Sequence, residues 1–463
     1  MSTDTSRTNF YTQGPLVPTL LKTALPIILV MSMNGLLTVA DALFLGRFVG
    51  PDALSAVTLM FPAYMILVAT ATLISSGMSS ILARDLGGER FADAKRVFTG
   101  AHGLSLGIGI LTVAVFSVAG YPLILAAAEG SDAIAGMAYT YMAITAWTSP
   151  LLFVLSVQSD SLRSEGYVMQ MAGVSLFVSL VNIALNFVFV VILDFGVAGT
   201  AAGTALAQLL SLLVIIGFRL RADSHLNPIV LFRHSWMSCW RPIFALGAPQ
   251  SLNFAGIAIG SAATFAALQL VGSSGYETTV AAFGLLTRVM TFVFLPLLGL
   301  IHALQAMIGN NYGAGAFDRT NATLRLGLLT AFFYSLAVQL LLSLFARPIG
   351  FLFVDDPAIV TELARILPIN IALMFAAGPL FVIGGYFQAL GDAKRAALIS
   401  LIKPYVFFLP LLLVLPYTFG EVGIWLAGPV SEGLLLLLVA VMLTSAARHG
   451  NTRWGLFLAD HPK

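Results

Sequence analysis

Twelve long apolar segments dominate this sequence, and each is long enough to cross a lipid bilayer as a helix, which takes about 20 residues. They lie at residues 18–46, 53–83, 97–120, 134–157, 170–193, 198–218, 242–270, 278–309, 326–346, 363–389, 398–416 and 422–446. Charged residues make up 10% of the 463 residues, whereas soluble domains carry roughly 25%. We therefore expect an all-α integral membrane protein with twelve transmembrane helices, tilted or kinked where the first, second, seventh and eighth segments exceed the bilayer.

The positions of Lys and Arg predict the orientation, because cytoplasmic loops carry an excess of these residues. With the N-terminus in the cytoplasm, 19 of the 23 Lys and Arg are assigned to cytoplasmic segments. Three, Arg47, Arg347 and Arg365, fall on the opposite side, and Arg288 lies within a span. We expect a multi-pass protein of the cell inner membrane, with both termini cytoplasmic and no cleaved signal peptide.

Several classes of function lack their sequence signatures. A single cysteine, Cys239, excludes an internal disulfide framework and a CxxC metal site. The net charge of +2 gives no reason to expect a nucleic-acid partner. The loop "DLGGERFADAKR" lacks the GxxxxGK[ST] pattern of a nucleotide site. An intramembrane enzyme would need HExxH, paired acids within the spans or a nucleophile with a histidine, and none is evident. We expect no cofactor and no enzymatic activity.

The second half of the chain repeats the first at offsets of about 223 to 230 residues. "LARDLGGERFADAKR" corresponds to "IGNNYGAGAFDRTNATLR", and "LDFGVAGTAAG" corresponds to "TFGEVGIWLAG". Each copy holds six spans, an even number, so both insert in the same direction and should be related by a pseudo-two-fold axis along the membrane normal. The predicted organisation is an N-terminal lobe at 1–220, a cytoplasmic linker at 221–241 and a C-terminal lobe at 242–463. Such an arrangement is typical of transporters with alternating access.

Asp41 is the one charged residue between Lys22 and Arg47. An acid within a span is expensive unless it is paired, protonated or functional. Helical spacing places further polar residues in three stripes of the first lobe: Asn34, Thr38 and Asp41 in the first span, Ser179, Asn182 and Asn186 in the fifth, and Thr200, Thr204 and Gln208 in the sixth. We expect these stripes to converge on a small polar cluster, although the neutral residues could instead serve to hydrogen-bond the helices together.

The order and duplication of these motifs resemble the MATE family of multidrug and toxic compound extrusion transporters. The resemblance covers roughly residues 20 to 450. It rests on the stretch from Pro26 to Gly46 with its acid, and on "GGERFADAKR", "QSDSLRSEG", "FQALGDAKR", "NIALNFVFV", "FGVAGTAAGTALAQ", "AAFGLLTRV" and "LPLLGL". The resemblance implies two six-helix lobes that export cationic or amphipathic compounds in exchange for H⁺ or Na⁺. The substrates are expected to be small molecules, and the transporter is expected to be monomeric.

The acid in the first lobe resembles the DinF-like branch of this family, and the lack of acids in spans seven and ten argues against a cation site in the second lobe. The resemblance assigns ion or proton coupling to Asp41, Asn182, Asn186 and Thr204. Similar proteins have a second acid at the place of Asn186. One carboxylate suits a proton better than Na⁺, because desolvation favours the neutral form of an acid, and a Na⁺ site at Asp41, Asn182 and Thr204 is the weaker alternative.

Other residues receive provisional roles. We expect Asn34, Thr38, Tyr139 and Gln208 to line the substrate cavity, with Tyr139 in an interfacial aromatic belt as the alternative. Pro26, and its counterpart Pro249, could be a hinge or a static kink.

Two charged positions and two histidines complete this set. Arg288 could extend to the interface or pair with Glu277 or Glu432, and Glu432 could otherwise be a second protonation site. His102 and His302 are expected to have structural roles.

The nearest alternative function keeps the architecture and changes the cargo. Flippases for lipid-linked oligosaccharides belong to the same superfamily, and they usually carry several basic residues within their cavity spans. Arg288 is taken as the one in-span cation of this chain, which favours multidrug efflux.

Overall fold

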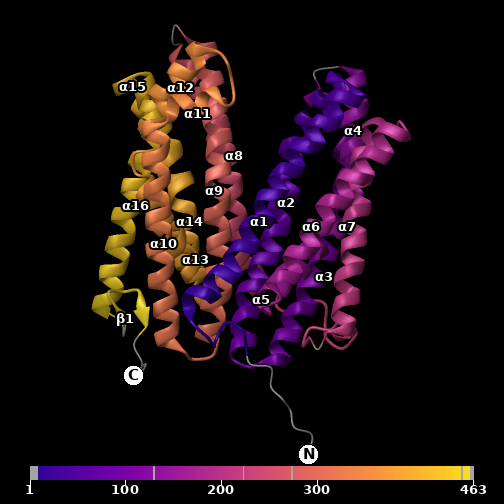
Figure 1. The fold of residues 1–463 in the computed structure, drawn as a ribbon, viewed down its shortest axis with the longest axis vertical. Coiled ribbons are helices and arrows are strands. Elements are labelled where there is room, and N and C mark those ends of the chain that lie inside the picture. Colours follow the sequence, from indigo (N-terminus) through magenta and orange to yellow (C-terminus); the bar gives the residue numbers. More distant parts are fainter. Residues whose placement is uncertain (1–8, 129–130, 223, 273–274, 450–451, 459–463) are drawn as a thin grey trace, which may run out of the picture. The chain divides into compact units, whose positions relative to one another are not determined.

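The computed structural model describes residues 9–128, 131–222, 224–272, 275–449 and 452–458, without the side chains of residues 34, 36, 38–40, 42, 43, 449 and 452. The described chain is almost entirely helical (Figure 1). Ten helices are long and apolar enough to cross a membrane, and two bent pairs of helices bring the number of spans to twelve. The all-α, twelve-span prediction is confirmed.

The first half comprises α1 (Leu16–Phe44), η1 (Leu45–Val49), α2 (Pro51–Gly87), α3 (Phe91–Ala127), α4 (Asp132–Trp147), α5 (Ser149–Ser164), α6 (Val168–Asn186), η2 (Phe187–Ile192) and α7 (Gly196–Arg221). The linker contains η3 (Pro228–Phe232). The second half comprises α8 (Trp240–Val271), α9 (Tyr276–Gly313), α10 (Phe317–Leu344), α11 (Ala346–Phe351), α12 (Pro357–Asn370), α13 (Met374–Leu390), α14 (Ala393–Leu401), η4 (Ile402–Phe408), α15 (Leu409–Phe419), α16 (Glu421–His449), β1 (Thr452–Arg453) and β2 (Phe457–Leu458).

The fourth and tenth spans are each broken into two helices. The bend between α4 and α5 is 48°, and the bend between α12 and α13 is 53°. Pro150 follows the first break by two residues, and because it has no N–H it cannot continue the ladder of hydrogen bonds. The lengths of the apolar segments predict kinks in the first, second, seventh and eighth spans and do not single out these two. Since the breaks occupy equivalent places in the two halves, they support the internal repeat.

Contacts divide the chain into two compact units. Unit 1 consists of residues 1–10 and 25–251, and unit 2 consists of residues 11–24 and 252–463. The linker therefore belongs to unit 1, and the first part of α1 belongs to unit 2. The change from one unit to the other falls just before Pro26 in α1 and two residues after Pro249 in α8.

In unit 1, α2 and α8 cross with their backbones in direct contact. A Cβ atom added at Gly77 would overlap the carbonyl oxygen of Ile243, and one added at Gly247 would overlap that of Leu73. Small residues let helices approach in this way. The fully buried side chains of Ile74 and Met78 then pack in the core of the unit.

In unit 2, described segments near both ends of the chain are fastened to α10. Arg319 of α10 donates hydrogen bonds to the backbone oxygens of Tyr11, Gln13 and Gly14, at 3.1, 3.0 and 2.8 Å. Near the C-terminus, β1 and β2 form a short antiparallel hairpin, whose Leu458 exchanges two hydrogen bonds with the side chain of Asn321. The core of this unit is built around Trp425, which is fully buried.

Candidate functional site

Four of the predicted polar residues form one continuous hydrogen-bonded chain in unit 1. The amide nitrogen of Asn186 donates to Asp41 Oδ1 at 2.6 Å and to Asn182 Oδ1 at 3.1 Å. The amide nitrogen of Asn182 donates to Thr204 Oγ1 at 2.8 Å, and Thr204 donates in turn to the backbone oxygen of Thr200 at 3.1 Å. The structure thus brings a residue of α1 together with residues of α6 and α7, two neighbouring helices that lie more than 120 residues further along the chain.

A close approach of α6 and α7 makes this chain possible. Asn186 and Asn182 are almost completely buried, as is Thr200. Gly203 of α7 leaves room for the side chain of Asn186, because a Cβ atom at this position would lie 2.5 Å from Asn186 Oδ1. Two acceptor atoms of the cluster, Asn186 Oδ1 and Thr200 Oγ1, are buried without a hydrogen-bond partner among the described residues. The cluster therefore offers one carboxylate and two unpaired, buried oxygens.

Two tyrosines that the sequence analysis did not select also belong to the surroundings of Asp41. The Asp41 carboxylate interacts electrostatically with the hydroxyl groups of Tyr64 in α2 and Tyr141 in α4. Tyr139, the tyrosine named from the sequence, was assigned to the substrate cavity. Two residues along a helix correspond to a rotation of about 200°, so Tyr139 and Tyr141 face different neighbours. A tyrosine within an apolar span could have marked these positions. The sequence alone did not show which tyrosine points toward the helix that carries Asp41.

The other predicted residues are placed as follows. Tyr139 stacks on Phe116 with ring centroids 5.6 Å apart and meets Tyr121 edge-on at 5.4 Å. Gln208 lies on α7 one turn beyond Thr204 and is half-buried. The side chains of Asn34 and Thr38 lie outside the described part of the structure. Pro26 lies inside α1, which continues as a helix on both sides of it.

In unit 2, the structure rules out one of the alternatives for Glu432 and places a second cation within a span. Glu432 forms an ion pair with Lys403, and not with Arg288. Lys403 was counted as cytoplasmic, but it lies in η4, within the eleventh span (Ala393–Phe419), so Arg288 is not alone as an in-span cation. Glu432 is 7% exposed and Lys403 is 29% exposed. The Arg288 side chain is exposed on α9. Spacing along one helix could not reveal a pair formed between two helices.

His102 links two helices of unit 1. Its Nδ1 lies 2.8 Å from the Phe98 backbone oxygen, and its Nε2 lies 3.0 Å from Nε2 of Gln158 in α5. Among the described residues, no group of three or more His, Cys, Asp or Glu is arranged to hold a metal ion.

Comparisons with solved structures match the whole fold. A crystal structure of a MATE protein in the bent conformation superimposes with a TM-score of 0.86 at 22% identity, covering 95% of this chain and 98% of that chain. An outward-facing multidrug resistance MATE family transporter of the MOP superfamily gives a TM-score of 0.81 at 22% identity, covering 94% and 96%. The predicted two-lobe, twelve-span fold is confirmed.

Sequence comparisons lead to the family. The FAD transporter of Shewanella oneidensis is 27% identical over 436 residues, covering 91% of this chain and 93% of that protein. The multidrug export protein MepA of Staphylococcus aureus is 22% identical over 437 residues, covering 92% and 93%. The MatE family model matches residues 26–188 and 256–414, which is more than half of the chain. This chain therefore belongs to the MatE family of multidrug and toxic compound extrusion transporters, whose members are transporters and not enzymes.

Proposed function

We propose that this transporter exports cationic or amphipathic small molecules by antiport with H⁺ through alternating access. In this proposal it is a monomer in the cell inner membrane, with both termini in the cytoplasm and a DinF-like arrangement of its acid. The hydrogen-bonded chain from Asp41 to Thr204 is the observation that carries the proposal. It places one carboxylate from α1 against neutral residues of α6 and α7, so a change in the charge of Asp41 alters what holds three helices together.

The geometry around Asp41 favours a proton over Na⁺ as the coupling ion. Hard cations are bound by oxygen ligands, but the group of Asn186 that faces Asp41 is an N–H donor. The side-chain oxygens of Asn182 and Thr204 already accept hydrogen bonds from Asn186 and Asn182. The two unpaired oxygens, Asn186 Oδ1 and Thr200 Oγ1, are neutral, so Asp41 is the one charged oxygen ligand that the cluster offers. A proton needs no such set of ligands, since it binds the carboxylate alone. Asp41 as the coupling acid, with Asn182, Asn186 and Thr204 as its supporting residues, is the arrangement that we infer.

Transport by the purified protein in proteoliposomes tests this function and the identity of the ion. We expect efflux of a fluorescent cation driven by an imposed pH gradient and insensitive to Na⁺. Replacing Asn186 with Asp supplies a second carboxylate and should increase the apparent affinity for Na⁺ on the order of tenfold, since ligand charge tunes cation affinity. Efflux driven by Na⁺ alone in the unsubstituted protein, with a protonophore present, would contradict proton coupling.

A second candidate cargo is an anionic dinucleotide. The relative from Shewanella oneidensis is named an FAD transporter, and the Lys403–Glu432 pair places a cation within a span of unit 2. A charge buried in a span is costly and usually functional, and an anionic group could take the place of Glu432 beside Lys403. The same proteoliposomes, loaded with FAD or with the fluorescent cation, separate the two cargoes. If the unsubstituted protein exports FAD, and Lys403→Gln abolishes this efflux but leaves cation efflux intact, the result favours a dinucleotide as a cargo.

We also propose that α1 bends at Pro26 during transport. Pro26 lacks the N–H that would bond to the carbonyl of Lys22, so bending costs less there than elsewhere in the helix. The change of α1 from unit 2 to unit 1 falls between Ala24 and Leu25. A hinge at this position lets the Asp41 end of α1 move relative to the other helices of unit 1, while the start of α1 stays fixed in unit 2.

Spin labels measure this motion. Cys239→Ser first removes the single native cysteine. Cysteines for the labels are then introduced at Arg47 and Ile192, which are exposed positions of unit 1. We expect the distance between the labels to change between alkaline and acidic buffer, and to stop changing in Pro26→Ala and in Asp41→Asn. Because both labels lie in unit 1, rigid movement of whole units leaves the distance constant. A constant distance in the unsubstituted background therefore contradicts the bend.

A further inference from the structure

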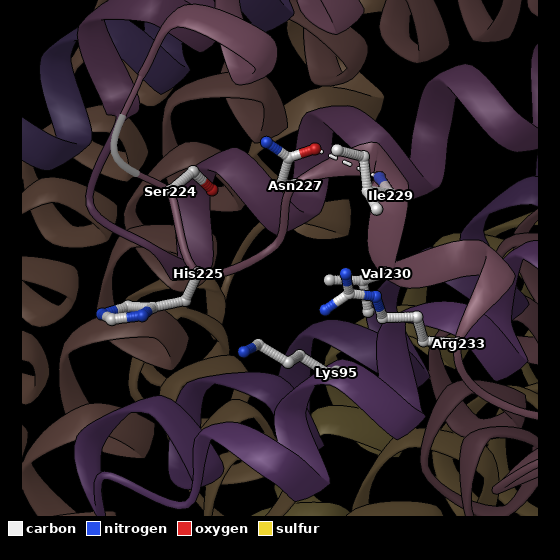
Figure 2. Close-up of a pocket in the computed structure, with 7 residues that line it drawn as sticks. All are labelled: Lys95, Ser224, His225, Asn227, Ile229, Val230 and Arg233. Atoms are coloured by element: carbon white, nitrogen blue, oxygen red, sulfur yellow. Dashed lines mark hydrogen bonds between the residues drawn. The ribbon is translucent and has the colours of Figure 1, made fainter.

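A basic cavity of about 300 Å³ lies between α3 and the linker. Figure 2 shows Lys95 of α3 on one side and Asn227, Val230 and Arg233 of the linker on the other. Ser224, His225 and Ile229 complete the lining. Lys95 is the fifth residue of α3, and the linker residues follow the end of α7 directly. The cavity therefore lies where α3 begins and α7 ends, beside the ends of two apolar helices.

The framework of this cavity is held in place by buried polar contacts. Ser224 donates to Glu165 at 2.6 Å and accepts from Arg219 at 3.1 Å. Arg219, which is fully buried, also binds Glu165 at 2.6 Å and thereby links the linker to α5 and α7. His225 stacks on Phe91 with ring centroids 4.0 Å apart. The linker thus presents a fixed surface to the cavity.

The polar groups that face the cavity are cations and hydrogen-bond donors. In the described part of the chain, no carboxylate lies within 4.0 Å of Lys95 or Arg233, whereas the neighbouring Arg96 is paired with Asp93 at 3.7 Å. The side-chain oxygen of Asn227 accepts from the backbone N–H of Ile229 at 3.1 Å, which leaves its NH₂ group for a ligand. Two cations and an amide donor match the oxygens of a phosphate group.

An apolar surface adjoins the basic cavity on the same linker. The side chains of Phe232, Met237, Ile229 and Trp236 are 86%, 74%, 52% and 39% exposed. The indole N–H of Trp236 is bonded to the backbone oxygen of Leu231 at 2.8 Å, which fixes this part of the linker. Aromatic and apolar side chains beside basic groups are typical of segments that lie in the interface of a membrane. A free phosphate would use the cations and leave these apolar side chains in water.

We propose that this cavity binds the headgroup of an anionic phospholipid from the leaflet that the linker faces, which is cytoplasmic in the orientation proposed above. Lys95 and Arg233 hold the phosphate, and Asn227 donates a further hydrogen bond. Phe232 and Met237 lie against the acyl chains. Basic pockets of this kind at the ends of spans are known to suit anionic headgroups. The linker is the segment that joins the two repeats. A lipid bound in this cavity would therefore hold that connecting segment at the membrane.

Lipid titration of the purified full-length protein in neutral detergent tests this site. Native mass spectrometry measures retained phosphatidylglycerol against phosphatidylcholine, and we expect preferential retention of phosphatidylglycerol. The double variant Lys95→Gln/Arg233→Gln should weaken phosphatidylglycerol binding roughly thirtyfold, because each cation near a membrane surface contributes about fivefold. The matched double variant Arg221→Gln/Arg241→Gln removes two nearby cations outside the lining and should change the affinity less than about threefold.

Two further arms keep the outcome decisive. Lys95→Arg keeps the charge and should retain phosphatidylglycerol binding, which separates lost recognition from lost folding. Phe232→Ala should weaken phosphatidylglycerol binding, since the acyl chains lose a contact. The proposal is overturned if both double variants weaken binding equally, or if millimolar inorganic phosphate displaces the lipid completely and Phe232→Ala has no effect. The latter result would identify a site for soluble phosphate.

Discussion

Asp41→Asn leaves the protein folded and inserted but lowers gradient-driven efflux by about tenfold or more, a loss within the range of free energies that couple two sites in a protein. Asparagine has nearly the shape of aspartate, and its side-chain oxygen can still accept the hydrogen bond that Asn186 gives to Asp41 at 2.6 Å. The cluster therefore persists, whereas the ability to bind and release a proton is lost. Efflux from proteoliposomes under an imposed pH gradient is the measurement.

The matched control is Asp52→Asn. Asp52 lies in the first turn of α2 and is exposed, so its neutralisation changes the net charge equally without touching the cluster. We expect near-normal efflux from this variant. If Asp41→Asn transports at the rate of the unsubstituted protein, Asp41 is not the coupling acid, and the polar cluster serves to hold the helices together.

Gly77→Ala and Gly247→Ala should each lower the free energy of unfolding by about 3 kcal/mol, the upper end of the usual cost of overpacking a protein interior. The added methyl group at Gly77 would overlap the carbonyl oxygen of Ile243, and that at Gly247 would overlap the carbonyl oxygen of Leu73. Both obstacles are backbone atoms, so no change of rotamer relieves them. The helices α2 and α8 must move apart, and the surrounding core of unit 1 loses its packing.

Thermal unfolding in detergent, followed by loss of the monodisperse species, measures this effect. Gly173→Ala and Gly217→Ala are the controls, because at either position the added Cβ has no heavy atom within 4 Å apart from the adjacent backbone of its own helix. Alanine favours a helix over glycine by about 1 kcal/mol, so these two variants should be as stable as the unsubstituted protein or more stable. A similar loss of stability in all four variants would argue against a specific contact between α2 and α8.

The hydropathy of the sequence was sufficient to predict the twelve spans, because a bilayer imposes its thickness on every helix that crosses it. The internal repeat was visible for a related reason, since equivalent segments of the two copies keep similar residues. Helical spacing also placed Asp41, Asn182, Asn186 and Thr204 on the stripes from which the structure builds one hydrogen-bonded chain. Their part in ion coupling stays a prediction. Periodicity works within one helix, where 3.6 residues per turn fix which side chains share a face.

Contacts between helices were decided by the tertiary structure. The sequence offered Arg288 as one possible partner of Glu432, but packing brings Glu432 to Lys403. The sequence did not point to Tyr64 and Tyr141, the tyrosines that interact with Asp41. The sequence also did not predict to which unit each end of α1 and α8 belongs. Nor did it predict the cavity between α3 and the linker. Packing against several helices at once sets how far each helix is rotated about its own axis and how deep it lies relative to its neighbours. Hydropathy carries no information on either quantity.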